Sequence, residues 1–133
     1  MSDRAVFEEE STQRGELRRL IESVLATYAA GHIPDRKLAQ AAVTESLALL
    51  AAVAPGRSVE VRVPPFGAVQ AVAGGAHRRG TPRAVVETDP ATWLQLAIGR
   101  LTWDQAQDCG ALLASGERSN LREHLPLVHL PKA

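Results

Sequence analysis

Residues 59–99 constrain the fold more than any other part of the chain, because they combine three short valine-rich runs with a clear helix start. Valine occupies every second position of residues 59–63, a pattern typical of a strand that buries one face. Proline and glycine separate this run from two further predicted strands, over 66–72 and 84–88. The 66–72 run is apolar on both faces except at Gln70, which predicts a central strand.

The helix after the third strand has two independent start signals. The Asp89 carboxylate can accept amide hydrogens at the N-cap, and Pro90 suits the first helical position because the amide there has no helical partner. Apolar residues then follow at helical spacing up to Gly99, which is suited to a left-handed C-terminal turn. A short helix over 103–108 and a strand over 111–114 come next. Strands and helices in this order predict a small sheet with a helix packed on it.

The N-terminal third of the chain is predicted to be helical after a loose start. Residues 1–14 are polar without periodicity, which predicts a flexible tail. Two helices, the second capped by Asp35, form a helical hairpin over 16–54 that either covers the sheet or provides a dimer surface. The sheet and helix body then spans 57–130. Residues 15–133 are therefore expected to form a single domain.

Composition narrows the class of protein. The chain has 133 residues, of which 45% are hydrophobic, so it can bury a core. Fifteen basic residues balance fifteen acidic ones, which argues against a nucleic-acid partner. One cysteine, Cys109, fits a reducing compartment. An acidic start and the lack of a long apolar run predict a cytoplasmic, unsecreted protein without stable membrane insertion.

No residue pattern predicts catalysis. The sequence has no glycine-rich phosphate loop, no paired cysteines, no histidines at metal-binding spacing and no nucleophile-elbow serine. We therefore expect no enzyme activity, no catalytic residues, no metal and no cofactor.

The sharpest local charge feature is a loop that contains His77, Arg78, Arg79 and Arg83. Arginine is well suited to bidentate contact with phosphate or carboxylate, so the loop is a candidate site for an anionic head group such as that of coenzyme A or a phospholipid. The alternative is a solvated loop whose arginines pair with nearby acidic residues.

Three segments resemble the sterol carrier protein family, in its short actinobacterial branch. They are RVPPFGAVQAV (62–72), HRRGTPRAVVETDPATWLQLAIGRLTW (77–103) and ASGERSNLREHLPL (114–127). The resemblance implies an α+β domain with a curved, mostly antiparallel sheet of about five strands, with helices on one side and an apolar cavity. In that family the cavity accepts sterols, fatty acyl chains or acyl-coenzyme A.

The largest apolar residues near the predicted sheet and its helices are the candidates for lining such a pocket: Phe66, Trp93, Leu96, Trp103 and Leu112. The alternative is that they only fill the core. Together with the resemblance they predict a non-enzymatic carrier that binds a lipid, a fatty acyl chain or acyl-coenzyme A. The competing hypothesis is an interaction module with a closed core and no ligand, which forms a homodimer through the N-terminal hairpin.

Overall fold

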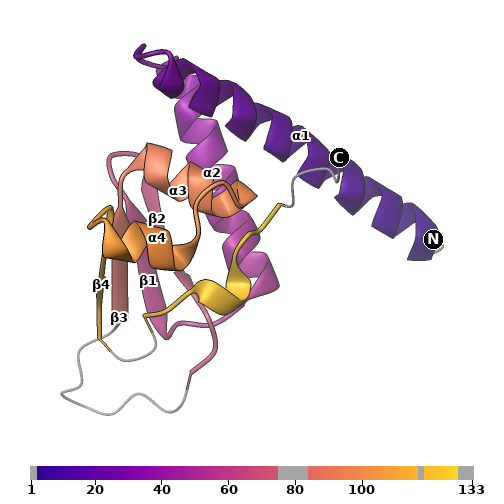
Figure 1. The fold of residues 1–133 in the computed structure, drawn as a ribbon. Coiled ribbons are helices and arrows are strands. Elements are labelled where there is room, and N and C mark those ends of the chain that lie inside the picture. Colours follow the sequence, from indigo (N-terminus) through magenta and orange to yellow (C-terminus); the bar gives the residue numbers. More distant parts are fainter. Residues whose placement is uncertain (1–2, 75–83, 117–118, 129–133) are drawn as a thin grey trace.

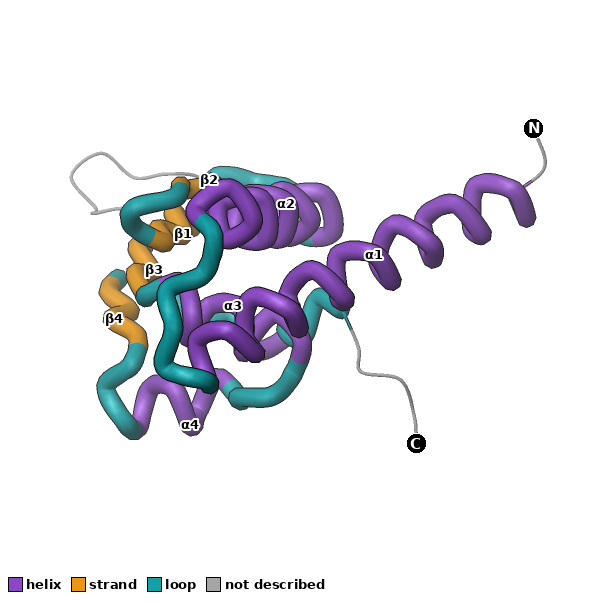
Figure 2. Tube along the Cα trace, turned by 90° about the horizontal axis from the view of Figure 1, so that it is seen from above, coloured by secondary structure: helices purple, strands orange, loops and turns teal. Residues whose placement is uncertain are grey.

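A computed structural model describes residues 3–74, 84–116 and 119–128. The elements, in chain order, are α1 (Asp3–Ala29), α2 (Arg36–Val53), β1 (Val59–Val63), β2 (Gly67–Ala71), β3 (Ala84–Thr88), α3 (Pro90–Ile98), α4 (Trp103–Asp108), β4 (Leu112–Ser115) and the 3-10 helix η1 (Arg122–His124). Helices α2, α3 and α4 lie on one side of the sheet (Figures 1 and 2). The α+β class is confirmed.

The sheet is mixed, with strand order β2-β1-β3-β4. Strands β1 and β2 pair antiparallel, β1 and β3 pair parallel, and β3 and β4 pair antiparallel. Val59, Val61 and Val63 are fully buried and Arg62 is exposed, so the alternation in β1 predicts its buried face correctly. The buried faces of β1 and β3 meet the helices, and the core lies between these two layers.

One expectation about the sheet is met in part and another needs correction. The resemblance implies about five mostly antiparallel strands. The described residues form four, and two of their three pairings are antiparallel, whereas the central pair, β1 with β3, is parallel. The reason is that the chain leaves β2 and returns on the far side of β1, so that β3 runs in the direction of β1. The prediction that the 66–72 run is central is wrong, because β2 is an edge strand with Ala68 and Gln70 exposed.

Helix α1 begins at Asp3, although a flexible tail is predicted up to residue 14. The missing apolar periodicity misplaces this boundary. The first turns are rich in glutamate and arginine, which favour helix by propensity, and Arg4 pairs with Glu8 one turn away at 3.0 Å. The second half of α1 packs on both α2 and α3, which differs from a simple two-helix hairpin, and the first half projects from the body (Figure 1).

The end of α1 lies close to the start of α3. Burial raises the pKa of the Tyr28 phenol, and the negative charge of Asp89 raises it further. At the other end of the fold, the amides of Leu127 and Val128 donate to the carbonyl of Ala97 at 2.8 and 3.0 Å. The segment after η1 is therefore fixed against α3.

We expect Asp89→Ala to lower the free energy of unfolding by about 1–2 kcal/mol. Asp89 Oδ1 accepts from the Thr92 amide at 2.7 Å and Oδ2 accepts from the Thr92 hydroxyl at 2.9 Å, as the predicted cap requires. Urea denaturation measures the change. Asp108→Ala is the control, because Asp108 is exposed at the end of α4 and makes no hydrogen bond through its carboxylate in the described part of the chain. Equal losses in the two variants would contradict the capping role.

Candidate functional site

Four of the five predicted pocket residues lie in the core. Trp93 and Leu96 on α3, Trp103 at the start of α4 and Leu112 on β4 are all buried. Phe66 lies elsewhere, in the turn between β1 and β2, where it is half-buried. The guanidinium carbon of Arg36 lies 5.8 Å from the centroid of the Phe66 ring, a cation–π contact with the start of α2.

The two tryptophans differ in how their indole N–H groups are satisfied. Trp93 Nε1 donates to the buried hydroxyl of Ser46 on α2 at 2.8 Å. The Ser46 hydroxyl in turn lies within hydrogen-bonding distance of the carbonyls of Ala42 and Val43. Trp103 Nε1 is also buried, and it is the one buried side-chain nitrogen or oxygen within the described ranges that has no hydrogen-bond partner. An acceptor brought by a ligand or a water would satisfy it.

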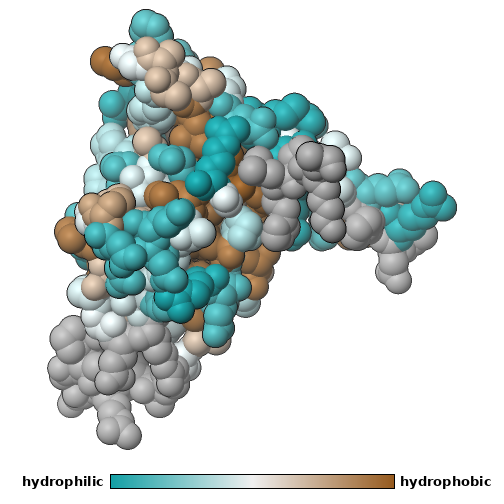
Figure 3. All heavy atoms as spheres, in the orientation of Figure 1, coloured by the Kyte–Doolittle hydropathy of each residue, from teal (hydrophilic) through white to brown (hydrophobic). Residues whose placement is uncertain are grey.

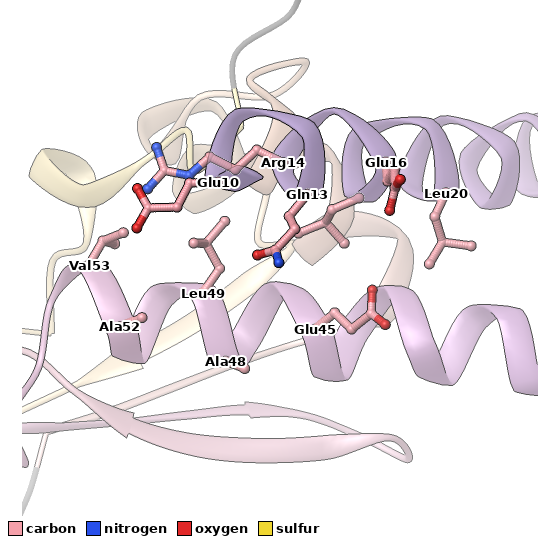
Figure 4. A pocket seen from close by; sticks show the side chains of 11 residues that line it. Glu10, Gln13, Arg14, Glu16, Leu20, Glu45, Ala48, Leu49, Ala52 and Val53 are labelled. Atoms are coloured by element: carbon pink, nitrogen blue, oxygen red, sulfur yellow. The ribbon is translucent and has the colours of Figure 1, made fainter. Parts of the chain in front are cut away.

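A groove of about 780 Å³ lies between the middle of α1 and the second half of α2. In Figure 4, Leu20 of α1 and Leu49 of α2 extend into the space between the two helices. We define the α1–α2 groove by the residues that line it: Glu10, Gln13, Arg14, Glu16, Leu17, Leu20, Glu45, Ala48, Leu49, Ala52 and Val53. It is open to solvent, and α1 and α2 form its walls.

The α1–α2 groove has an apolar floor and a charged rim. Leu17, Leu20 and Leu49 are buried or half-buried and belong to the core or pack against it. Most of the polar lining residues come from α1, and Arg14 is the one cation among them. Ligand sites commonly combine an apolar surface with a few charged groups that orient the ligand, and they measure about 300–1,000 Å³.

Residues 35–127 match the family model described as bacterial SCP ortholog, where SCP stands for sterol carrier protein. The match covers more than half of the chain. The chain belongs to the bacterial SCP ortholog family. No curated protein matches it. The SCP family consists in general of non-enzymatic lipid carriers, so lipid binding is the class of function that membership supports.

The matched region places the α1–α2 groove partly outside the shared SCP domain. Helix α2 lies inside the match, whereas α1 precedes it. One wall of the groove in this SCP-family protein therefore comes from the domain and the other from the helix in front of it.

Three other predictions for this SCP-family chain concern the head-group loop, metal binding and membrane insertion. The head-group loop with His77, Arg78, Arg79 and Arg83 lies outside the described residues, so it stays a prediction. The described part of the chain holds no cluster of three or more metal-ligating side chains. Among the described helices, none has both the length and the apolar character needed to cross a bilayer.

Sequence reasoning missed the α1–α2 groove for an identifiable reason. Glu10, Gln13 and Arg14 fall in the predicted tail, so the sequence does not predict them on a helix face. Val6, Glu10, Gln13, Leu17 and Leu20 do repeat at spacings of three and four, but Glu10 and Gln13 are polar, so no apolar stripe marks this face of α1.

Proposed function

We propose that this SCP-family protein is a non-enzymatic carrier that binds the acyl chain of a lipid in the α1–α2 groove. The observation that carries the proposal is a groove with an apolar floor in a member of a lipid-carrier family. A fatty acid or an acyl-coenzyme A is the ligand class that family membership favours. Its chain would lie over Leu17, Leu20 and Leu49. Arg14 is the one cation of the lining that could meet its anionic end, and three glutamates on the same rim oppose that end, so the acyl chain must supply most of the binding free energy.

The openness of the groove favours weak, reversible binding. Each fully buried methylene contributes about 0.8 kcal/mol, so ten methylenes would gain about 8 kcal/mol if water were fully excluded. In an open groove about half of that is realised, and association costs reduce it further. A net gain of about 4 kcal/mol corresponds to a dissociation constant of about 1 mM, so binding is millimolar or weaker, which suits a carrier that must release its cargo. We propose that this exchange takes place in the cytoplasm.

The interior layer beneath α3 and α4 is the alternative site for the same ligand. It contains four of the sequence-predicted pocket residues, and the unpartnered Nε1 of Trp103 favours an acceptor there. The two sites are separable by spectroscopy. The chain has two tryptophans, both are buried in the core, and neither lines the groove.

We expect Ala52→Phe to weaken binding of a fluorescent fatty acid at least tenfold, or about 1.4 kcal/mol, because the ring fills the groove. Ala52 is exposed, so the substitution leaves the core intact. Ala26→Phe is the matched control, since Ala26 is also an exposed helical alanine but does not line the groove. Titration of each variant, with palmitoyl-coenzyme A as a competitor, measures the change.

Three other results would each contradict part of the proposal. No saturable binding by the unmodified chain would remove the carrier function. Binding that is unaffected by Ala52→Phe and that shifts tryptophan emission would place the ligand in the interior layer. A dimer that dissociates when residues 1–54 are deleted, without any ligand binding, would favour the homodimeric interaction module instead.

A further inference from the structure

The turn between α1 and α2 exposes apolar side chains to an unusual degree. Ile33 is 95% exposed and Leu38, in the first turn of α2, is 49% exposed. Single exposed apolar residues are common and need no explanation. Here two of them lie five positions apart, beside the proline at position 34, at one end of the molecule (Figure 1).

The same turn carries a local positive charge in a chain whose net charge is zero. Arg36 and Lys37 are both exposed. Asp35 is the one acidic residue between positions 23 and 44, and its Oδ1 accepts from the amides of Lys37 and Leu38 at 3.0 and 3.2 Å. Its charge is therefore directed at the start of α2. Figure 3 shows hydrophobic and hydrophilic atoms side by side at this end of the molecule.

The loop between β1 and β2 lies against the turn between α1 and α2. The cation–π contact between Arg36 and Phe66 connects the start of α2 to the loop between β1 and β2. Pro64 and Pro65 of that loop are exposed next to Phe66 in the sequence. Apolar and basic groups of two loops therefore meet at one end of the fold. We call Ile33, Arg36, Lys37, Leu38 and Phe66 the tip.

We propose that the tip makes reversible contact with an anionic lipid surface. Ile33 would enter the boundary between head groups and acyl chains, while Arg36 and Lys37 meet the phosphates. A basic side chain close to an anionic bilayer strengthens binding about fivefold, and an inserted apolar side chain does so about tenfold. One such cluster gives transient contact, because lasting attachment requires a second anchor.

A lipid surface fits the tip better than a protein does. A stable protein interface needs about 800 Å² from each partner, and the tip offers only a few side chains on a convex turn. The pairing of one projecting apolar side chain with two cations at the start of the next helix matches the layering of an anionic bilayer, in which charge lies above hydrocarbon. The inference goes beyond the proposed carrier function, because it concerns where the protein would meet a membrane.

Flotation of the full chain with vesicles tests the tip. We expect binding to vesicles that contain phosphatidylglycerol, about tenfold weaker for Ile33→Ser and about fivefold weaker for Lys37→Gln. Salt at about 1 M should reduce it, because the Debye length falls to about 3 Å. Leu113→Ser is the matched control, since Leu113 is 69% exposed on β4, away from the tip. We expect it to bind like the unmodified chain.

Several outcomes would overturn the tip proposal. These are no binding to anionic vesicles, equal losses for Ile33→Ser and Leu113→Ser, or a change in sedimentation of Ile33→Ser that shows a protein contact. Ile33 makes no buried contact, so Ile33→Ser should fold normally, and a loss of vesicle binding would not result from unfolding. The carrier function is tested separately, because Ile33→Ser should leave fatty acid binding in solution unchanged and Ala52→Phe should leave vesicle binding unchanged.

Discussion

Trp93→Ala should lower the free energy of unfolding by about 3–5 kcal/mol, a loss large enough to unfold a marginally stable domain. Trp93 is fully buried and is among the largest side chains of the core, where it sits on α3 between α1 and α2. Its removal leaves a cavity that the surrounding helices cannot close without moving together. Guanidinium denaturation followed by circular dichroism measures the change, since the variant retains only one tryptophan for fluorescence.

The hydrogen bond of Trp93 is separable from its volume. Ser46→Ala leaves the buried indole N–H without a partner, which costs about 1–3 kcal/mol. Trp93→Phe should therefore cost less in the Ser46→Ala background than in the unmodified chain. Trp103→Phe is the matched control. Trp103 Nε1 has no partner among the residues that the structure describes, so that substitution loses volume only and should be additive with Ser46→Ala. If the losses of Trp93→Phe and Ser46→Ala also added up, the result would contradict a stabilising hydrogen bond between Trp93 and Ser46.

Local signals explain most of what could be predicted from the sequence. The bounds of β1 and β3 and the caps at Asp35 and Asp89 follow from alternation, glycine, proline and short polar side chains. Each of these acts over a few residues, so one stretch of sequence is enough to specify it. The left-handed Gly99 at the end of α3 is another case.

Strand neighbours could not be predicted in this way. The β2 segment looks central because its sequence is apolar, yet it forms an edge. Which strand lies beside β1 depends on how the strands are connected, and periodicity within a strand contains no information about the connections. The resemblance implied a mostly antiparallel sheet, which two of the three pairings confirm, but it did not predict the parallel pairing of β1 with β3.

The buried Trp93–Ser46 contact and the α1–α2 groove could not be predicted from local sequence patterns either. Trp93 and Ser46 are 47 residues apart, so no pattern of nearby residues in the sequence predicts their hydrogen bond. The α1–α2 groove needs the first half of α1 to be helical, and that half lacks the apolar stripe that reveals a helix. Its formation depends on helix propensity and on pairs such as Arg4 with Glu8, both of which are weaker signals.

Gly56→Ala is the second substitution for which we expect a large effect, a loss of about 3 kcal/mol or more. Gly56 follows α2 and has a φ of 149°, a conformation that side chains disfavour. A Cβ atom there would lie 2.2 Å from the carbonyl oxygen of Val72. That oxygen belongs to backbone, so no side-chain rotation relieves the clash.

The clash would disturb a junction that several hydrogen bonds hold. The Val72 amide donates to the Ala54 carbonyl at 2.6 Å, while the Ser58 amide and hydroxyl donate to the Val72 carbonyl at 3.0 and 2.7 Å. Together these bonds tie the end of β2 to the end of α2. An alanine at 56 forces either this junction or the local backbone to move, and both costs add to the unfavourable φ.

Gly110→Ala separates the clash from the backbone preference. Gly110 also has a positive φ, 76°, but a Cβ atom there would meet nothing within 4 Å. We expect it to cost only about 1–2 kcal/mol, the price of a left-handed alanine. Urea denaturation of both variants gives the comparison. Equal losses would mean that the chain between α2 and β1 relaxes freely, and that the hydrogen bonds of Val72 do not fix the end of the helix that forms one wall of the groove.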